Sequence, residues 1–98
     1  MRVAWSPLAD EQVDDAVAYI ARDHPTAALE WLERLLDQVK SLSVFPDSGR
    51  MVPELQRDDI RELIVSPYRV MYRRRDDRVE IVAIRHESRA FDEREVSP

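Results

Sequence analysis

Arginine is concentrated in the C-terminal half of this 98-residue chain. Of its 15 basic residues, eleven are arginines at or after residue 50, and Lys40 is the one lysine. Arginine makes planar, forked contacts to phosphate and carboxylate groups. Such contacts could therefore be built in the second half, although a GC-rich genome would produce the same bias without any function.

The acidic residues are distributed differently from the basic ones. The formal net charge is −5, which argues against a generic nucleic-acid binder. Residues 1–49 carry four basic and nine acidic side chains, whereas residues 50–98 carry eleven of each. Cysteine is absent, which excludes disulfides and thiolate chemistry.

Length and composition predict one domain, residues 1–98, with a modest hydrophobic core. The chain is 44% hydrophobic, which is enough for one such core. The first twenty residues mix charged and apolar side chains, a pattern typical of neither a signal peptide nor a membrane span. We therefore expect a cytoplasmic protein with no membrane partner.

The N-terminal half predicts a short strand followed by two helices. Residues 3–5 are an apolar run that suits an edge strand. Ser6-Pro7 is typical of a helix start, and apolar residues at helical spacing extend this helix to about Arg22. A second helix begins around Pro25, and the short break between the two indicates an antiparallel hairpin. Its apolar stripe comprises Ala28, Leu29, Trp31, Leu32, Leu35, Leu36, Val39 and Leu42.

The C-terminal half changes to the two-residue period of β-strands. Within residues 68–73, Arg69 and Arg73 fall on the face opposite Tyr68 and Tyr72. Turn residues separate this segment from its apolar neighbours. The three predicted strands are residues 61–65, 68–73 and 79–85.

Together these elements predict an α+β fold. We expect an N-terminal edge strand and an antiparallel two-helix hairpin packed on a C-terminal three-strand antiparallel meander. The helices cover one face of the sheet, so Arg69 and Arg73 are predicted to project from the other face toward solvent or a partner. The single glycine, Gly49, is predicted to take a backbone angle that other residues avoid. Trp5, Tyr19, Trp31 and Tyr72 are predicted to pack in the core or the hairpin.

These residues, in this order, resemble the RelE/ParE superfamily of bacterial toxins. The resemblance covers nearly the whole chain, and it implies the same strand, hairpin and sheet. It also implies a labile antitoxin, encoded beside the gene, that wraps the toxin. The matching segments are residues 5–9, Tyr19-Ile20, Gly49-Arg50, residues 61–63, residues 68–73, Val79, Ile81, His86 and Arg89.

One branch of this superfamily cleaves messenger RNA in the ribosomal A site. Metal-free cleavage of RNA needs a base, a cation beside the phosphate and an acid. The resemblance implies that Arg69 would hold the scissile phosphate, with Arg89 as a second phosphate ligand. Glu54 resembles the base of one nuclease branch, and His86 could be the acid. No metal or cofactor is expected.

Several positions depart from the nuclease pattern. Ile60 and Glu62 stand about where the lysines of the RelE branch would fall, and its C-terminal tyrosine is missing. His86 is displaced by about one residue from the nuclease histidine. Because a one-residue slip in a strand moves a side chain to the opposite face, this displacement bears directly on catalysis.

The other branch, resembling ParE, inhibits DNA gyrase by binding. Acidic helices and an arginine-bearing sheet suit recognition of protein surfaces, and His86 and Arg89 would then shape a binding edge. We favour this interpretation, with the endoribonuclease and a non-toxic antitoxin-binding module as alternatives. For each candidate residue, a purely structural role is the alternative to a role in catalysis or binding. Further candidates for contacts with substrate, target or antitoxin are Arg50, Arg61, Arg73 and Arg85.

Overall fold

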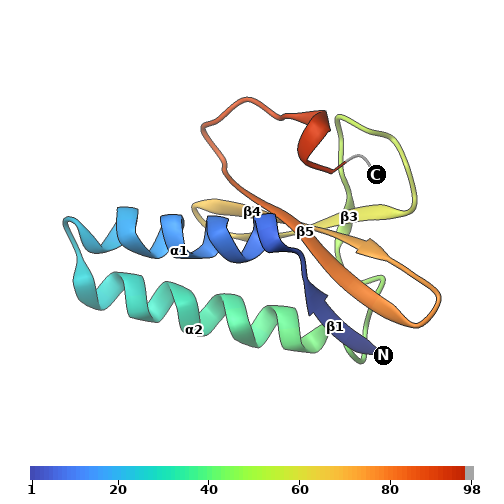
Figure 1. Cartoon of the computed structure of the whole chain (residues 1–98), viewed down its shortest axis with the longest axis horizontal. Helices are drawn as coiled ribbons and strands as arrows, with labels where there is room; N and C mark the ends of the chain where they lie inside the picture. Colours follow the sequence, from blue (N-terminus) through green and yellow to red (C-terminus); the bar gives the residue numbers. More distant parts are fainter. Residues whose placement is uncertain (97–98) are drawn as a thin grey trace.

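The computed structural model describes residues 1–96 and places two helices side by side against a five-stranded sheet (Figure 1). Among these residues no helix is long and apolar enough to cross a membrane. The elements in chain order are β1 (Arg2–Trp5), α1 (Pro7–Ala21), α2 (Pro25–Ser41), β2 (Arg50–Met51), β3 (Ile60–Val65), β4 (Tyr68–Arg74), β5 (Arg78–His86) and a short 3₁₀ helix, η1 (Glu93–Glu95).

The start of α1 follows from two adjacent residues. The Ser6 hydroxyl accepts a hydrogen bond from the backbone N–H of Ala9 at 3.0 Å, which satisfies one of the free donors of the first turn. Pro7 occupies the first turn, where its missing N–H costs nothing. Only three residues separate α1 from α2, and the predicted antiparallel hairpin is confirmed.

The sheet has the strand order β1-β5-β4-β3-β2. Strands β3, β4 and β5 pair in antiparallel fashion, which confirms the predicted meander. Two short strands extend it at the edges. β1 runs parallel to β5, with Val3 opposite Val79, and β2 pairs antiparallel with β3. The sheet is therefore mixed.

The main core lies between the helix pair and one face of the sheet. Trp31 on α2 is 1% exposed and packs against Tyr68, with ring centroids 5.0 Å apart. Its indole N–H donates to the carbonyl of Val65 at 2.9 Å, which ties α2 to the end of β3. Two residues of the predicted stripe, Leu29 and Leu36, lie on the outer side of α2. They are therefore 62% and 50% exposed.

The second face of the sheet is covered as well, and here the sequence prediction was wrong. Arg69 and Arg73 lie on the face opposite the helices, as predicted, but they are 8% and 5% exposed. The segment after β2 and the C-terminal segment close over them, and the latter lies across the strands from the helices in Figure 1. The residues of this second cluster are Val52, Leu55, Ile60, Met71, Val82, Ala83, Phe91 and Val96.

Gly49 is required by close packing and not by its backbone angle. Its φ is not positive, which contradicts the prediction. A Cβ at this position would lie 2.7 Å from the carbonyl oxygen of Glu62 and 2.7 Å from the ring and hydroxyl of Tyr72. The Gly49 N–H donates to that hydroxyl at 2.9 Å. Glycine therefore allows the chain to pass directly over the end of Tyr72.

Candidate binding and catalytic site

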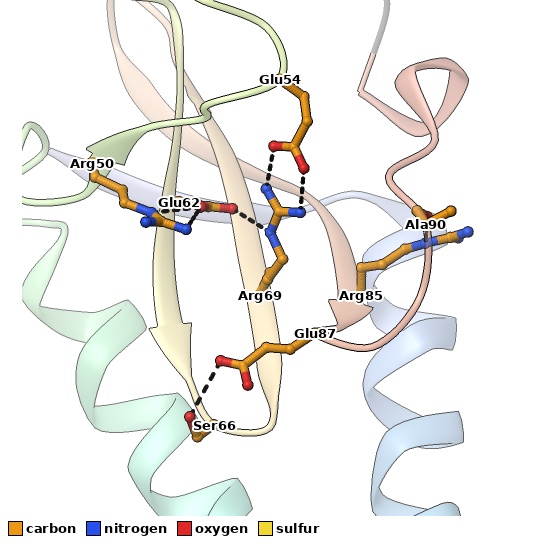
Figure 2. Close-up of polar contacts among 8 residues, drawn as sticks. All are labelled: Arg50, Glu54, Glu62, Ser66, Arg69, Arg85, Glu87 and Ala90. Atoms are coloured by element: carbon orange, nitrogen blue, oxygen red, sulfur yellow. Dashed lines mark hydrogen bonds and ion pairs between the residues drawn. The ribbon is translucent and has the colours of Figure 1, made fainter.

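Arg69 lies in β4 and is bound by two carboxylates (Figure 2). Its two terminal nitrogens donate to both oxygens of Glu54, at 2.9 and 2.7 Å. Its Nε donates to Glu62 in the neighbouring strand at 2.8 Å. The other oxygen of Glu62 accepts a hydrogen bond from Nε of Arg50 at 2.7 Å. The result is a chain of four alternating charges across β2, β3, β4 and the loop.

Burial makes this chain of charges structurally important. The Glu62 side chain is fully buried, so its charge depends on Arg50 and Arg69 for compensation. The hydrogen bonds that Arg69 donates to Glu54 raise the pKa of Arg69, which keeps its guanidinium charged. Phe91 adds a contact from the C-terminal segment, with its ring centroid 5.5 Å from the guanidinium carbon.

Glu54 is held as an ionised acceptor. The hydrogen bond from Arg69 lowers its pKa, although partial burial opposes this effect. A general base works best when its pKa lies near the working pH. The pair with Arg69 therefore makes Glu54 a weaker base. Each nitrogen of Arg69 already donates to a carboxylate, so a phosphate would compete with Glu54 and Glu62 for the charge of this guanidinium.

His86 lies on the other face of the sheet from Arg69. In the pairing of β4 with β5, His86 is opposite Tyr68, whereas Arg69 is opposite Arg85. Tyr68 belongs to the helix-facing core, and its ring centroid is 5.1 Å from that of His86. Side chains alternate between faces along a strand, so Arg69 and His86 are separated by the sheet itself. Four residues predicted as one catalytic group are thus split, with Glu54 beside Arg69 and Arg89 near His86.

Arg89 differs from the other candidate arginines. Its backbone N–H donates to the carbonyl of His86 at 3.0 Å, in the turn that follows β5. Across residues 1–96, its guanidinium has no hydrogen bond or ion pair with another side chain. It therefore remains available to a ligand or partner.

The remaining candidates hold the fold together. Arg61 donates to the carbonyl of Gly49 at 2.9 Å, and Arg73 donates to that of Val96 at 2.7 Å. Arg85 donates to the carbonyl of Ala90 at 2.8 Å and pairs with Glu95. With Arg50 on Glu62, these side chains tether the segments that cover the second face.

Sequence reasoning missed Glu62 as the centre of the charge network. The two-residue period of β3 offered a signal, because it places Glu62 on the same face as Ile60, opposite the face of Leu63. In the pairing with β4, Glu62 is opposite Met71 and diagonal to Arg69, and the Arg69 side chain reaches it at 2.8 Å. Within the described chain, no group of three or more histidine or acidic side chains could hold a metal ion.

The lowered pKa of Glu54 predicts how stability depends on pH. A carboxyl whose pKa is lower in the folded state adds stability above its unfolded pKa, about 4.3, and loses it as the pH falls through the folded pKa. The difference in free energy of unfolding between wild type and Glu54→Gln should therefore be larger at pH 7 than at pH 3. Urea denaturation at both pH values measures it. A difference independent of pH would show that the Glu54 charge adds no stability.

Comparisons with known proteins identify the family. Residues 3–91 match a family described as the ParE toxin of the type II toxin-antitoxin system, parDE. The chain belongs to the ParE toxin family. This confirms the resemblance to the RelE/ParE superfamily, and a ParE-family chain is the toxin of a type II pair, which implies a cognate antitoxin.

Individual relatives of this ParE-family chain agree with the assignment. Protein Y4kP of Sinorhizobium fredii is 34% identical over 87 residues, covering 87% of this chain and 86% of Y4kP. Toxin RelE2 of Caulobacter vibrioides is 35% identical over 86 residues, covering 87% of this chain and 91% of RelE2. A chain of the chromosomal ParDE toxin–antitoxin system from P. aeruginosa superposes with a TM-score of 0.73 at 21% identity. The superposition covers 88% of this chain and 95% of the P. aeruginosa chain. This last likeness shows a shared fold.

Proposed function

We propose that this toxin arrests growth by binding DNA gyrase, without a catalytic centre of its own. The observation that carries the proposal is the separation of Arg69 from His86 by the sheet. Cleavage of RNA needs a phosphate ligand, a base and an acid around one phosphate. Inhibition by binding needs no such arrangement, and it leaves Arg69 free to act as a structural ion pair.

The match to the ParE family supports the same direction, because ParE is the branch that the sequence resemblance connects with gyrase inhibition. An endoribonuclease that acts on ribosome-bound messenger RNA is the second candidate. One contact favours it: Glu54 lies 2.7 Å from Arg69, as a base beside a phosphate ligand would. One relative, 35% identical, also has the name toxin RelE2, after the branch to which the nuclease interpretation refers.

We also propose that the cognate antitoxin covers apolar side chains left exposed on the helices. Leu29 and Leu36 lie seven residues apart on α2, and they are 62% and 50% exposed, respectively. Residues at that spacing share one side of a helix, which suits an amphipathic segment of a partner. Toxin and antitoxin would then meet in the cytoplasm, where gyrase and ribosomes also act.

Induction of the gene in cells can separate the two mechanisms. We expect plasmid supercoiling to fall while messenger RNA stays intact, and we expect Glu54→Gln to be as toxic as wild type. Co-expression of the neighbouring antitoxin frame should restore growth. Rapid loss of intact messenger RNA that requires Glu54 and Arg69 would refute the gyrase proposal in favour of the nuclease. No effect on either process would favour the non-toxic binding module.

A further inference from the structure

A cavity of about 490 Å³ opens between α1 and the end of β5. This size lies within the range of ligand pockets in proteins. Tyr19 projects into it from α1, Tyr68 and His86 come from the paired ends of β4 and β5, and Arg89 follows β5. Tyr19 is 58% exposed, so of the two predicted places, core or hairpin, the core is excluded.

The hydrogen bonds around His86 fix which of its ring nitrogens can donate. The backbone N–H of Ser88 donates to Nδ1 at 3.0 Å, so Nδ1 carries no hydrogen. The neutral ring therefore has its hydrogen on Nε2. The ring is flanked by Tyr68 at 5.1 Å and Tyr19 at 6.3 Å, in edge-to-face arrangements. His86 is thus held in one orientation by two aromatic neighbours and one backbone bond.

Donors dominate one side of this cavity. Arg89 brings a guanidinium that no side chain in residues 1–96 binds, and His86 brings Nε2–H. Burial raises the pKa of Tyr68, which keeps its hydroxyl protonated and able to donate. An acidic group is the natural acceptor for donors of this kind.

The C-terminal segment forms and anchors the opposite wall. Glu95 accepts a hydrogen bond from Gln12 of α1 at 2.8 Å and pairs with Arg85 of β5. Arg73 holds the next residue, Val96, through its carbonyl at 2.7 Å. The cavity is therefore preformed, because every element of its wall is bonded to another.

We propose that this cavity is the centre of the target-binding surface and receives an acidic side chain of the target protein. The proposal rests on the proposed function and specifies where gyrase is bound. The carboxylate would be held by Arg89 and His86, with its aliphatic stem against Tyr19. Tyrosine and arginine in a pocket are typical of the residues that dominate binding energy at protein interfaces.

Charge favours a protein over a nucleic acid as the occupant. The cavity offers one unpaired guanidinium, which matches one carboxylate. Asp15 also lines it, and its charge would repel the successive phosphates of an RNA strand, whereas the charge of Glu95 is compensated by Arg85. The backbone N–H groups of a peptide could instead donate to Asp15, which forms no ion pair within residues 1–96.

Inhibition of purified DNA gyrase tests this proposal. Arg89→Gln and Tyr19→Ala should each raise the concentration needed for half-inhibition of supercoiling by about tenfold or more. Both side chains lie at the surface of the cavity, so both variants should fold, which thermal unfolding checks. Arg75→Gln is the matched control, because Arg75 lies at the opposite end of β4 and β5 from the cavity and should leave inhibition unchanged.

The possible results distinguish this inference from the proposed function. If wild type inhibits gyrase and both cavity variants inhibit equally well, the cavity inference is overturned while the function stands. If wild type does not inhibit gyrase, the proposed function itself fails. Binding of a single-stranded RNA oligonucleotide that Arg89→Gln abolishes would overturn the choice of a protein occupant.

Discussion

Replacing Glu62 with alanine is expected to lower the free energy of unfolding by about 3–5 kcal/mol. The Glu62 carboxylate is fully buried and compensates both Arg50 and Arg69. Without it, the largely buried guanidinium of Arg69 loses one of its two acidic partners, and removing one member of a buried pair leaves an uncompensated charge. Denaturation in urea at neutral pH measures the effect.

Glu54→Ala provides the matched control for this prediction. Glu54 binds the same arginine through two hydrogen bonds, but its side chain is 40% exposed. Water screens its charge and replaces its hydrogen bonds, so we expect a loss of about 1 kcal/mol or less. Equal losses of unfolding free energy in both variants would mean that burial does not determine how much these carboxylates contribute to stability.

Ile60→Ala is expected to cost about 2–5 kcal/mol, because it removes a fully buried side chain from the second cluster. Ile60 packs under the segments that fold over the sheet face opposite the helices. The cost includes both the lost transfer of apolar atoms from water and the cavity left behind. Thermal or urea unfolding checks the value.

Ile64→Ala is the matched control within the same strand. Ile64 lies four residues from Ile60, on the same face, but it is 38% exposed. We expect a loss of less than about 1 kcal/mol there. If Ile60→Ala cost no more than Ile64→Ala, the face opposite the helices would not hold a second core.

The helices and strands were predictable because each depends on local pattern. Ser6-Pro7 marks the start of α1 through capping and a fixed proline φ, and α1 begins at Pro7. The two-residue period of residues 68–73 placed Tyr68 and Tyr72 under the helices, and both are buried there. These signals act over a few residues, so one sequence is sufficient to read them.

The cover over the second face was not predictable from the same signals. Val52 and Val96 lie in segments without a period, and each is buried through contacts with residues far away in the chain. Gly49 likewise depends on the hydroxyl of Tyr72, which is 23 residues away. Pairing between distant segments determines such features, and the local spacing of residues along the chain does not indicate that pairing.

The candidate site divides in the same way. The strand period correctly placed Arg69 and Arg73 on the face opposite the helices, but their charges were expected to be available because that face was predicted to be uncovered. Their buried acceptors, Glu62 and the carbonyl of Val96, explain why they are not. The arginine bias of this half therefore reflects internal tethering to a large extent, and Arg89 is the candidate that remains open to a partner.

The most direct test of this account is the supercoiling of relaxed plasmid by purified DNA gyrase in the presence of the purified toxin. We predict that supercoiled product decreases as the toxin concentration rises, with the same dependence for wild type and Glu54→Gln. Undiminished supercoiling at a large molar excess of folded toxin over gyrase would contradict the account.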